Sequence, residues 1–404
     1  MFRGLKYDDF LPVKVTMLRK LLITLAVLVL ACVAVLLFLP SFTDQRMNGI
    51  AMHPPYTANA RAQALHQKLF VADLHDDALL WSRDLLRRYD YGHADLPRLQ
   101  EGHVSLQVFS TVTKTPRGLN FERNASDTDN ITMLAMAQRW PQRTWNSLLQ
   151  RALYQSEKLH AAAQDSGGRM RVVRTQADLA AVFQDPSPTG GRLAAVLATE
   201  GLHPLEGKLK NVDTLYDAGF RIAGLTHFFD NEVGGSAHGM EKGGLTPFGK
   251  LVITRLEDKK IIVDLAHASP KVIDDVLAMA RRPVLVSHTG VQGTCAGPRN
   301  LSDAHIKRIA AQGGVIGIGY FEGAVCGLDV ASIVKAIRYT VSLAGVQHVA
   351  LGSDFDGATK TAFDTTGLVL LTQGLLESGF NEEEVADIMG GNVRRLLGAL
   401  LPGA

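Results

Sequence analysis

Histidine and carboxylate side chains recur at the ends of short apolar runs in this sequence. His75 and Asp77 close the run LFVADLHDD (69–77), and Glu200 lies at the end of LAAVLATEG (193–201). The corresponding place in later runs is taken by His227, His267, His288 and Asp354. Imidazole and carboxylate ligands without thiolates suit Zn²⁺, with Mn²⁺ or Co²⁺ as alternatives. The pattern predicts metal-assisted hydrolysis, since bound metals activate water and polarise a carbonyl.

The number of these residues decides between a structural and a metal-binding interpretation. A single buried histidine at a strand end is more often a hydrogen-bonded core residue than a ligand. Four histidines and three carboxylates at successive ends favour a metal, because burying such groups without a partner is costly. His75 and Asp77 are two residues apart, so on a strand both face the same side and can reach one ion. Glu200 lies between the two sets and could bridge two ions.

Other chemistries have little support in the sequence. Ser287 and Ser353 precede two of the candidate residues, but there is no G-x-S-x-G elbow. No flavin or nicotinamide motif is visible, so redox chemistry is not expected. With 42 Lys and Arg against 40 Asp and Glu, a net charge of +2 gives no electrostatic footprint for nucleic acid.

The cysteines (Cys32, Cys295, Cys326) form no CxxC pattern, and a Cys295–Cys326 pair stays an open alternative.

The apolar runs that carry these residues must share one scaffold. They span residues 69–77, 104–110, 193–201, 220–227, 260–267, 283–288, 314–320 and 348–354. Continuous apolar runs are typical of strands covered on both faces. Helix-like stretches lie between most of them, and Ser269 and Ser302 are expected N-caps. The alternation predicts a (β/α)8 TIM-like barrel, with a doubly wound sheet as the alternative. Extra helices, including 140–164, are expected between Ser110 and Arg192, and 185–191 is expected to be a surface loop.

The N-terminal region predicts one transmembrane helix before the barrel. Leu21 to Leu39 contains no charge and would span about 28 Å, roughly one hydrocarbon core. The basic residues that precede it are Arg3, Lys6, Lys14, Arg19 and Lys20. By the positive-inside rule the body is exported, to the periplasmic face of a bacterial inner membrane. A cleaved signal peptide is the alternative.

This topology divides the chain into four expected segments. They are a cytoplasmic segment (1–20), a transmembrane anchor (21–40), a connector (41–61) and a catalytic barrel (62–404). The bilayer would then be one partner of the chain, through the anchor.

Several segments, in order, resemble the membrane dipeptidase (renal dipeptidase-like, M19) family. They are DLHDD (73–77), TEGLHPLEG (199–207), the segments 221–231 and 244–269, PVLVSH (283–288), RN (299–300) and GSDFDG (352–357). The likeness runs from about residue 69 to 395. It implies a (β/α)8 enzyme with two Zn²⁺ per chain that hydrolyses dipeptides with a metal-bridging hydroxide. Such enzymes often accept a D-residue at the C-terminal position.

The resemblance also implies a metal-ligand set. His75 and Asp77 would bind one zinc, His267 and His288 the other, and Glu200 would bridge them. Leu74 and Asp76 stand where the family commonly has Gly and Asn, which changes the surroundings of the ligands but keeps both of them.

The same resemblance implies roles toward the substrate. His227 would contact the substrate and stabilise the oxyanion, Arg299 would pair with the substrate carboxylate, and Asp354 would transfer a proton near the leaving amine. The planar guanidinium of Arg299 suits a carboxylate. Asp354 and Asp356 could instead form turns. For His203 and His238 the expected state is that of solvated loop histidines.

Three functions follow from these observations. The first is a dizinc dipeptidase. The second is a binuclear metal hydrolase of a lactone, amide or phosphoester, which would not need Arg299 for a free carboxylate. The third is a non-catalytic, membrane-tethered binding protein. Side-chain preference, the physiological substrate and homodimer formation stay open.

Overall fold

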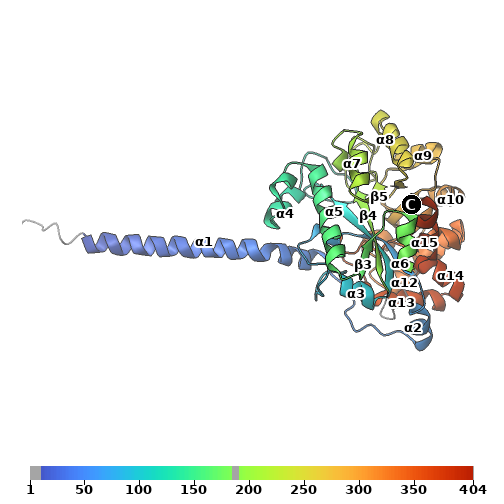
Figure 1. Cartoon of the computed structure of the whole chain (residues 1–404), viewed down its shortest axis with the longest axis horizontal. Helices are drawn as coiled ribbons and strands as arrows, with labels where there is room; N and C mark the ends of the chain where they lie inside the picture. Colours follow the sequence, from blue (N-terminus) through green and yellow to red (C-terminus); the bar gives the residue numbers. More distant parts are fainter. Residues whose placement is uncertain (1–10, 184–190, 404) are drawn as a thin grey trace, which may run out of the picture.

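The computed structural model describes residues 11–183 and 191–403; for residues 11–16 and 31–37 it describes the backbone alone. The described strands form one parallel sheet in the order β2-β1-β9-β8-β7-β6-β5-β4-β3, and β2 also pairs with β4 (Figure 1). This pairing closes eight strands into a barrel and leaves β3 beside β4. The predicted (β/α)8 barrel is therefore confirmed, and the open doubly wound sheet is wrong.

The strands of the barrel coincide with the apolar runs of the sequence. Their bounds are β1 Val71–Asp76, β2 Val104–Val112, β4 Leu193–Glu200, β5 Phe220–Gly224, β6 Ile262–Asp264, β7 Leu285–Thr289, β8 Val315–Ile318 and β9 Val349–Leu351. Ala194 and Val196 of β4 belong to one apolar cluster and Ala195 and Leu197 to the other. Both faces of the strand are thus covered, which is why its sequence is apolar without alternation.

Helices surround the barrel (Figure 1). They are α2 Ala60–His66, α3 Leu96–Glu101, α7 Asn211–Asp217, α8 Pro247–Asp258, α9 Pro270–Met279, α10 Asp303–Ala311, α11 Glu322–Val325, α12 Val330–Ala344, α13 Leu368–Glu377, α14 Glu382–Ala386 and α15 Asn392–Leu400. The expected N-caps are confirmed: Ser269 accepts a hydrogen bond from Val272 N and Ser302 from His305 N. Each cap satisfies an amide that the first turn leaves free.

The long interval between β2 and β4 contains the expected insertion. It holds α4 (Ile131–Ala137), α5 (Leu148–Asp165), β3 (Met170–Val172) and α6 (Gln176–Phe183). β3 was not predicted from the sequence and is only three residues long. Residues 184–190, most of the expected surface loop at 185–191, lie outside the described part of the chain.

The N-terminal helix α1 (Leu11–Met47) projects away from the barrel (Figure 1). It continues through the first residues of the expected connector 41–61. Among the described residues, no helix combines the length and apolar character needed to cross a membrane. The structure thus confirms a helix over the predicted anchor, and the place of this helix in a membrane stays a prediction. Residues 1–10 of the expected cytoplasmic segment, and the side chains of 31–37 within the anchor, lie outside what is described.

Candidate active site

The predicted site residues meet at one end of the barrel. His75 lies in β1 with Asp77 directly after it, Glu200 ends β4, and His288 lies in β7. The other members follow the ends of their strands: His227 after β5, His267 after β6 and Asp354 after β9. Because all eight strands are parallel, their C-terminal ends open on the same mouth. Side chains far apart in the sequence are therefore brought together.

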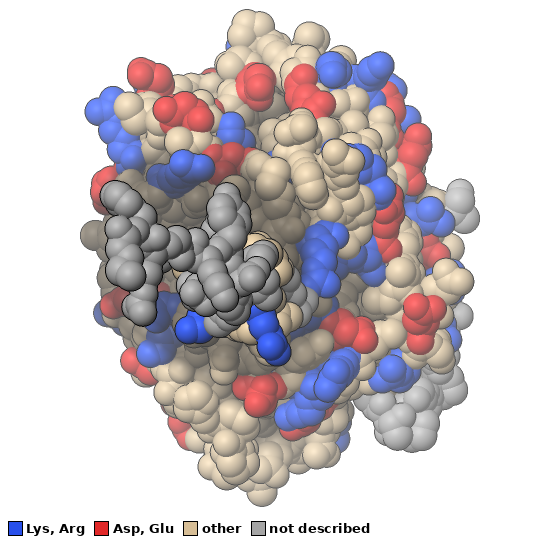
Figure 2. Space-filling model, turned by 90° about the vertical axis from the view of Figure 1, so that its left-hand side faces the viewer, with Lys and Arg blue, Asp and Glu red and all other residues tan. Residues whose placement is uncertain are grey.

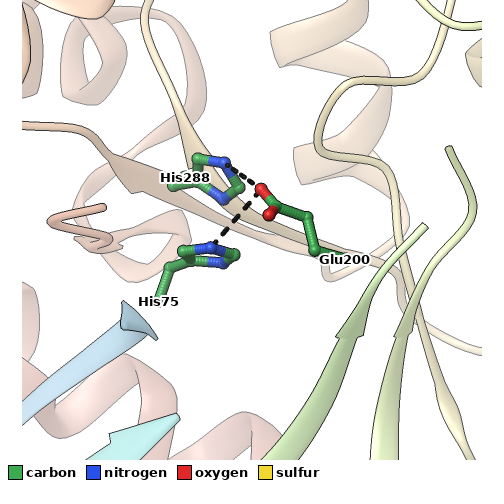
Figure 3. A group of neighbouring side chains, drawn as sticks. All are labelled: His75, Glu200 and His288. Atoms are coloured by element: carbon green, nitrogen blue, oxygen red, sulfur yellow. Dashed lines mark ion pairs between the residues drawn. The ribbon is translucent and has the colours of Figure 1, made fainter. Parts of the chain in front are cut away.

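Glu200 is the centre of the cluster. Its Oε1 lies 3.1 Å from His267 Nε2, 3.4 Å from His288 Nε2 and 3.5 Å from His75 Nε2. Figure 3 shows the rings of His75 and His288 beside this carboxylate. The second oxygen, Oε2, lies 3.2 Å from His227 Nε2. One carboxylate thus faces four imidazoles, an arrangement that suits a bridging ligand.

Two close pairs of side chains lie beside Glu200. His75 Nε2 is 3.3 Å from Asp77 Oδ2 and 3.9 Å from Asp354 Oδ1. His267 Nε2 is 3.0 Å from His288 Nε2. The pairing agrees with the ligand sets that the resemblance implies, although the division of ligands between two ions stays a prediction.

The donor atoms fit metal ions. Three groups of ligand atoms lie within 4.8 Å of one another: His75, Glu200 and His288; Glu200, His227 and His267; and His75, Asp77 and Asp354. Two imidazole nitrogens that face each other at 3.0 Å need a proton or a cation between them. Asp77 Oδ1 is also buried without a hydrogen-bond partner. Such a set of histidine and carboxylate donors is typical of zinc sites.

Burial controls the protonation of the cluster. It lowers the pKa of His227, His267 and His288 well below the usual value, so these imidazoles are neutral and able to act as ligands. Burial, reinforced by Asp77, raises the pKa of Glu200 well above that of an ordinary glutamate. A bound cation would reverse this effect, because positive charge favours the carboxylate form.

Two neighbouring groups respond differently to burial. For His75, burial opposes the charged form, but Asp77 and Glu200 outweigh it and raise the pKa to about 10. Burial also raises the pKa of Asp354 to about 7. The raised pKa of His75 reflects the negative charge of Asp77 and Glu200 beside it, which a cation would neutralise.

Two buried aspartates without a predicted role, Asp73 and Asp264, hold the strand ends near the candidate ligands. Asp73 accepts hydrogen bonds from His75 N and from Ser353 N and Oγ. Asp264 accepts from Ala266 N and Ser287 N. Each precedes a candidate ligand, His75 or His267, by two or three positions, which was the available signal in the sequence. They fix the backbone from which these candidate ligands extend.

Two site residues have unusual backbone conformations. His267 has φ 60° and Asp354 has φ 64°, both in the left-handed region that non-glycine residues rarely adopt. Backbone strain of this kind concentrates at functional sites, where the surrounding structure holds it. Each of these residues lies three positions after the end of its strand, where the chain turns and the side chain joins the cluster.

Arg299 lies at the same mouth, in the loop after β7. It is 5% exposed, and its Nη2 donates a hydrogen bond to His288 O. Its Nε is buried without a partner, and burial lowers its pKa to about 10. The guanidinium therefore keeps an unused donor beside the cluster, as an arginine that awaits an anion would.

The loop that carries Arg299 is held at several points. The side-chain amide of Asn300 donates to Cys295 O and Ala324 O, and its Oδ1 accepts from Gly290 N. Cys295 and Cys326 form a disulfide, which settles the pairing that the sequence left open. The bond joins this loop to the end of α11, after β8.

Burial, hydrogen bonds and ion pairs decide three further predictions about loop residues. His203 and His238 are 3% and 0% exposed, so the expectation of solvated loop histidines is wrong for both. Each is covered by an aromatic ring, Phe229 for His203 and Phe228 for His238. Asp356 does not join the metal cluster: it accepts from His93 N and Ala94 N and pairs with Arg83.

A cavity of about 810 Å³ opens over the cluster. Asp77, Glu200, His227, His267, Arg299 and Asp354 lie in its wall. Apolar side chains from the β1–β2 region, α4 and the end of α1 form most of the remainder. The contribution of α1 and α4 to this cavity wall was not predicted from the sequence.

A closed parallel barrel with clustered histidines and carboxylates at its mouth is typical of metal-dependent hydrolases. The profile of the membrane dipeptidase family (peptidase family M19) matches residues 59–400. The chain belongs to this family. It is a metallo-dipeptidase, as the sequence resemblance implied.

Individual relatives agree with the family. A dipeptidase, aclJ, of Aspergillus oryzae is 27% identical over 354 residues, covering 81% of this chain and 77% of its own. An uncharacterised protein of the pqqA 5′ region of Klebsiella pneumoniae is 30% identical, covering 57% of this chain and 89% of its own.

Solved structures share the fold. The probable dipeptidase PvdM of Pseudomonas aeruginosa superposes with a TM-score of 0.70 at 19% identity, covering 84% of this chain and 98% of its own. A metallopeptidase of Rhodobacter sphaeroides, liganded with a phosphinate mimic of L-Ala-D-Ala, superposes with a TM-score of 0.65 at 22% identity. The match covers 82% of this chain and 99% of its own.

Proposed function

We propose that the chain is a dizinc dipeptidase that tolerates a D-residue at the C-terminal position of its substrate. The observation that carries this proposal is that Glu200 Oε1 lies within 3.5 Å of His75 from one pair and of His267 and His288 from the other. More histidine and carboxylate donors gather at this carboxylate than one tetrahedral ion takes, which favours two ions. Zinc ions held there would lower the pKa of a shared water and polarise the scissile carbonyl.

The protein side chains divide the remaining tasks. His227, neutral because of burial, can donate one N–H to the oxygen on which negative charge develops. The free donor of Arg299 suits the substrate's C-terminal carboxylate. Asp354, with its pKa raised by burial to about 7, can hold and release a proton for the leaving amine.

Tolerance of a D-residue is the finer part of the proposal. A structural neighbour from Rhodobacter sphaeroides binds a mimic of a dipeptide with a C-terminal D-Ala. The cavity of about 810 Å³ over the cluster would leave room for a C-terminal side chain of either configuration.

A dipeptide panel with both configurations at the second position tests the function, assayed with and without a chelator. We expect hydrolysis of L-Ala-L-Ala and L-Ala-D-Ala, abolished by the chelator and restored by Zn²⁺. Activity that survives complete metal removal would contradict the mechanism. Hydrolysis of lactones or phosphoesters in preference to dipeptides would favour the second candidate, a binuclear metal hydrolase of a lactone, amide or phosphoester.

We further propose that the catalytic barrel lies at the periplasmic face of a bacterial inner membrane, tethered by α1. The basic residues before the apolar segment support this orientation. Apolar side chains of α1 such as Leu21, Leu22 and Leu30 are 66%, 57% and 67% exposed, a costly arrangement in water.

A further inference from the structure

The end of α1 is fixed to the active-site end of the barrel by buried charges. Asp44 of α1 is 1% exposed, and its Oδ2 accepts from Arg83 Nε at 2.8 Å. Arg83 Nη2 pairs in turn with Asp356 Oδ1 at 2.7 Å, two residues beyond Asp354. Asn48 Oδ1, one residue after the helix, accepts from Ala358 N of the same loop. These buried contacts hold the end of α1 against the loop that carries Asp354.

Residues of α1 next to these contacts line the active-site cavity. Leu39, Pro40, Thr43 and Met47 form part of its wall, together with Asp77, Glu200 and Arg299. α4 lies on the side of the barrel from which α1 projects and touches it (Figure 1). Ile131 and Leu134 of α4, with Leu80 and Trp81 after β1, continue this apolar wall. The cavity therefore has one mostly apolar side, made by elements outside the barrel strands.

This apolar side lies across the mouth from Arg299. The described strands follow one another around the barrel as β1, β2, β4, β5, β6, β7, β8 and β9. β2 and β7 are thus opposite each other. Arg299 follows β7, whereas α4 follows β2. A substrate whose carboxylate binds Arg299 and whose scissile bond lies at Glu200 extends its N-terminal residue toward α4 and α1.

We propose that the end of α1 and α4 form a subsite for the N-terminal residue of the substrate, and that this subsite takes a long apolar side chain. The proposal rests on the dipeptidase function argued above. The substrate class is then a dipeptide with a bulky aliphatic N-terminal residue.

The size and surroundings of the cavity support this class. A volume of about 810 Å³ is suited to a drug-sized ligand and leaves room beyond two small residues. The rim is also apolar: Leu39 and Met47 of α1 are 42% and 44% exposed, and Met133 of α4 is 62% exposed. Figure 2 views the molecule from the side on which α1 projects, where charged side chains of both signs are interspersed. An apolar substrate group would cover part of the exposed rim.

The test compares dipeptides of the form Xaa-Ala, with Ala, Leu or 2-aminodecanoic acid as Xaa, using the full chain in lipid nanodiscs. Each fully buried methylene favours binding about fourfold. We expect KM for the long-chain substrate to be at least about tenfold below that for Ala-Ala. Met47→Ser should raise KM for the long-chain substrate about threefold to tenfold and reduce the ratio between the two substrates.

Met240→Ser is the matched control. Met240 is 42% exposed, nearly as much as Met47, and is not part of the cavity wall. This variant should keep both the KM values and their ratio. The reversed substrate, with Ala first and the long chain second, should not respond selectively to Met47→Ser.

The outcomes separate this proposal from the function on which it rests. A KM independent of side-chain length, or equal effects of Met47→Ser on both substrates, overturns the subsite while the dipeptidase function stands. If no dipeptide is hydrolysed, the proposed function fails. Calorimetric binding of the long-chain dipeptide to the wild type and to Met47→Ser then still decides the subsite, and equal affinities would overturn it.

Discussion

At the scale of single residues, the site is a set of buried groups that are costly without a cation. Glu200 is 5% exposed and His288 is 1% exposed, and both side chains face Nε2 of His267. Burial keeps the imidazoles neutral, so their lone pairs are free for a metal. A cation shared among these groups would remove the cost of burying them and would create the reactive centre.

His267→Ala should lower the zinc content from about two ions to about one per chain. Turnover should fall more than about 100-fold, because loss of a direct ligand exceeds the effect of losing a supporting contact. Elemental analysis of protein purified without added metal measures the zinc content, and dipeptide hydrolysis rates measure the turnover. His53→Ala is the control, since His53 is exposed and should leave metal and activity unchanged. Full metal content in the His267 variant would exclude it as a ligand.

Arg299→Lys should keep the charge but lose the paired hydrogen bonds to a carboxylate. A charge-assisted contact contributes about 1.5–3 kcal/mol, so kcat/KM should fall about 10- to 150-fold. Metal content should not change. Dipeptide amides, which lack the carboxylate, should be poor substrates of the wild type and lose little more in the variant. Equal losses for acids and amides would show that Arg299 acts on structure instead.

At the scale of elements, loops that follow neighbouring strands are joined to hold the site. The loop after β7 carries Arg299 and is tied to the end of α11 by the Cys295–Cys326 disulfide. Asn300 adds hydrogen bonds to the same neighbour. A loop that must present a buried arginine in one orientation needs such restraint, because the barrel fixes only its two ends.

Replacing Cys295 and Cys326 together by Ser should lower the free energy of unfolding by about 2–4 kcal/mol, as expected for a closed loop of this size. Chemical denaturation monitored by tryptophan fluorescence measures it. Reductant should destabilise the wild type by a similar amount and have no effect on the double variant. A reductant-sensitive double variant would show that the loss comes from elsewhere.

At the scale of the whole molecule, a barrel and a protruding helix form one structure. The buried pair of Asp44 and Arg83 connects the helix to the loop that carries Asp354. The helix is thereby part of the catalytic domain as well as a candidate anchor. Removing it entirely would expose Arg83, which is 4% exposed in the intact chain.

If the proposed topology holds, a reporter fused after Ala404 should be active only on the exported side. Alkaline phosphatase, which requires export, should be active there, and a cytoplasmic fluorescent reporter should not. Fusing the same reporters before residue 1 gives the opposite readout as a control. An active cytoplasmic reporter at the C-terminus would overturn the orientation.

Acid stability provides another test of the whole fold. His66 contacts Thr372 and Gly102, and burial lowers its pKa to about 4. Between pH 6.5 and 4 the unfolded chain binds a proton that the folded chain does not. The free energy of unfolding should therefore decrease as the pH is lowered through this range, by at most about 1.4 kcal/mol per pH unit from this group. His66→Gln should make the decline shallower; an unchanged slope would contradict the assignment.

The sequence by itself determined the strands and the residues that gather at their ends, while it left a doubly wound sheet as the alternative to the barrel. Its β-branched apolar runs indicated strands buried on both faces, and their ends carried His75, Glu200, His267 and His288. Local pattern suffices here, because in a parallel barrel the end of each strand has a fixed place at the mouth.

Only the tertiary structure decided which surfaces surround that centre. It buries His203 and His238, pairs Cys295 with Cys326 and places the end of α1 in the cavity wall. These features join segments that are distant in sequence and lie in loops or in the insertion, where no periodicity marks a burial side. Their positions follow from long-range packing and buried charge pairs, which a linear pattern of residue types does not encode.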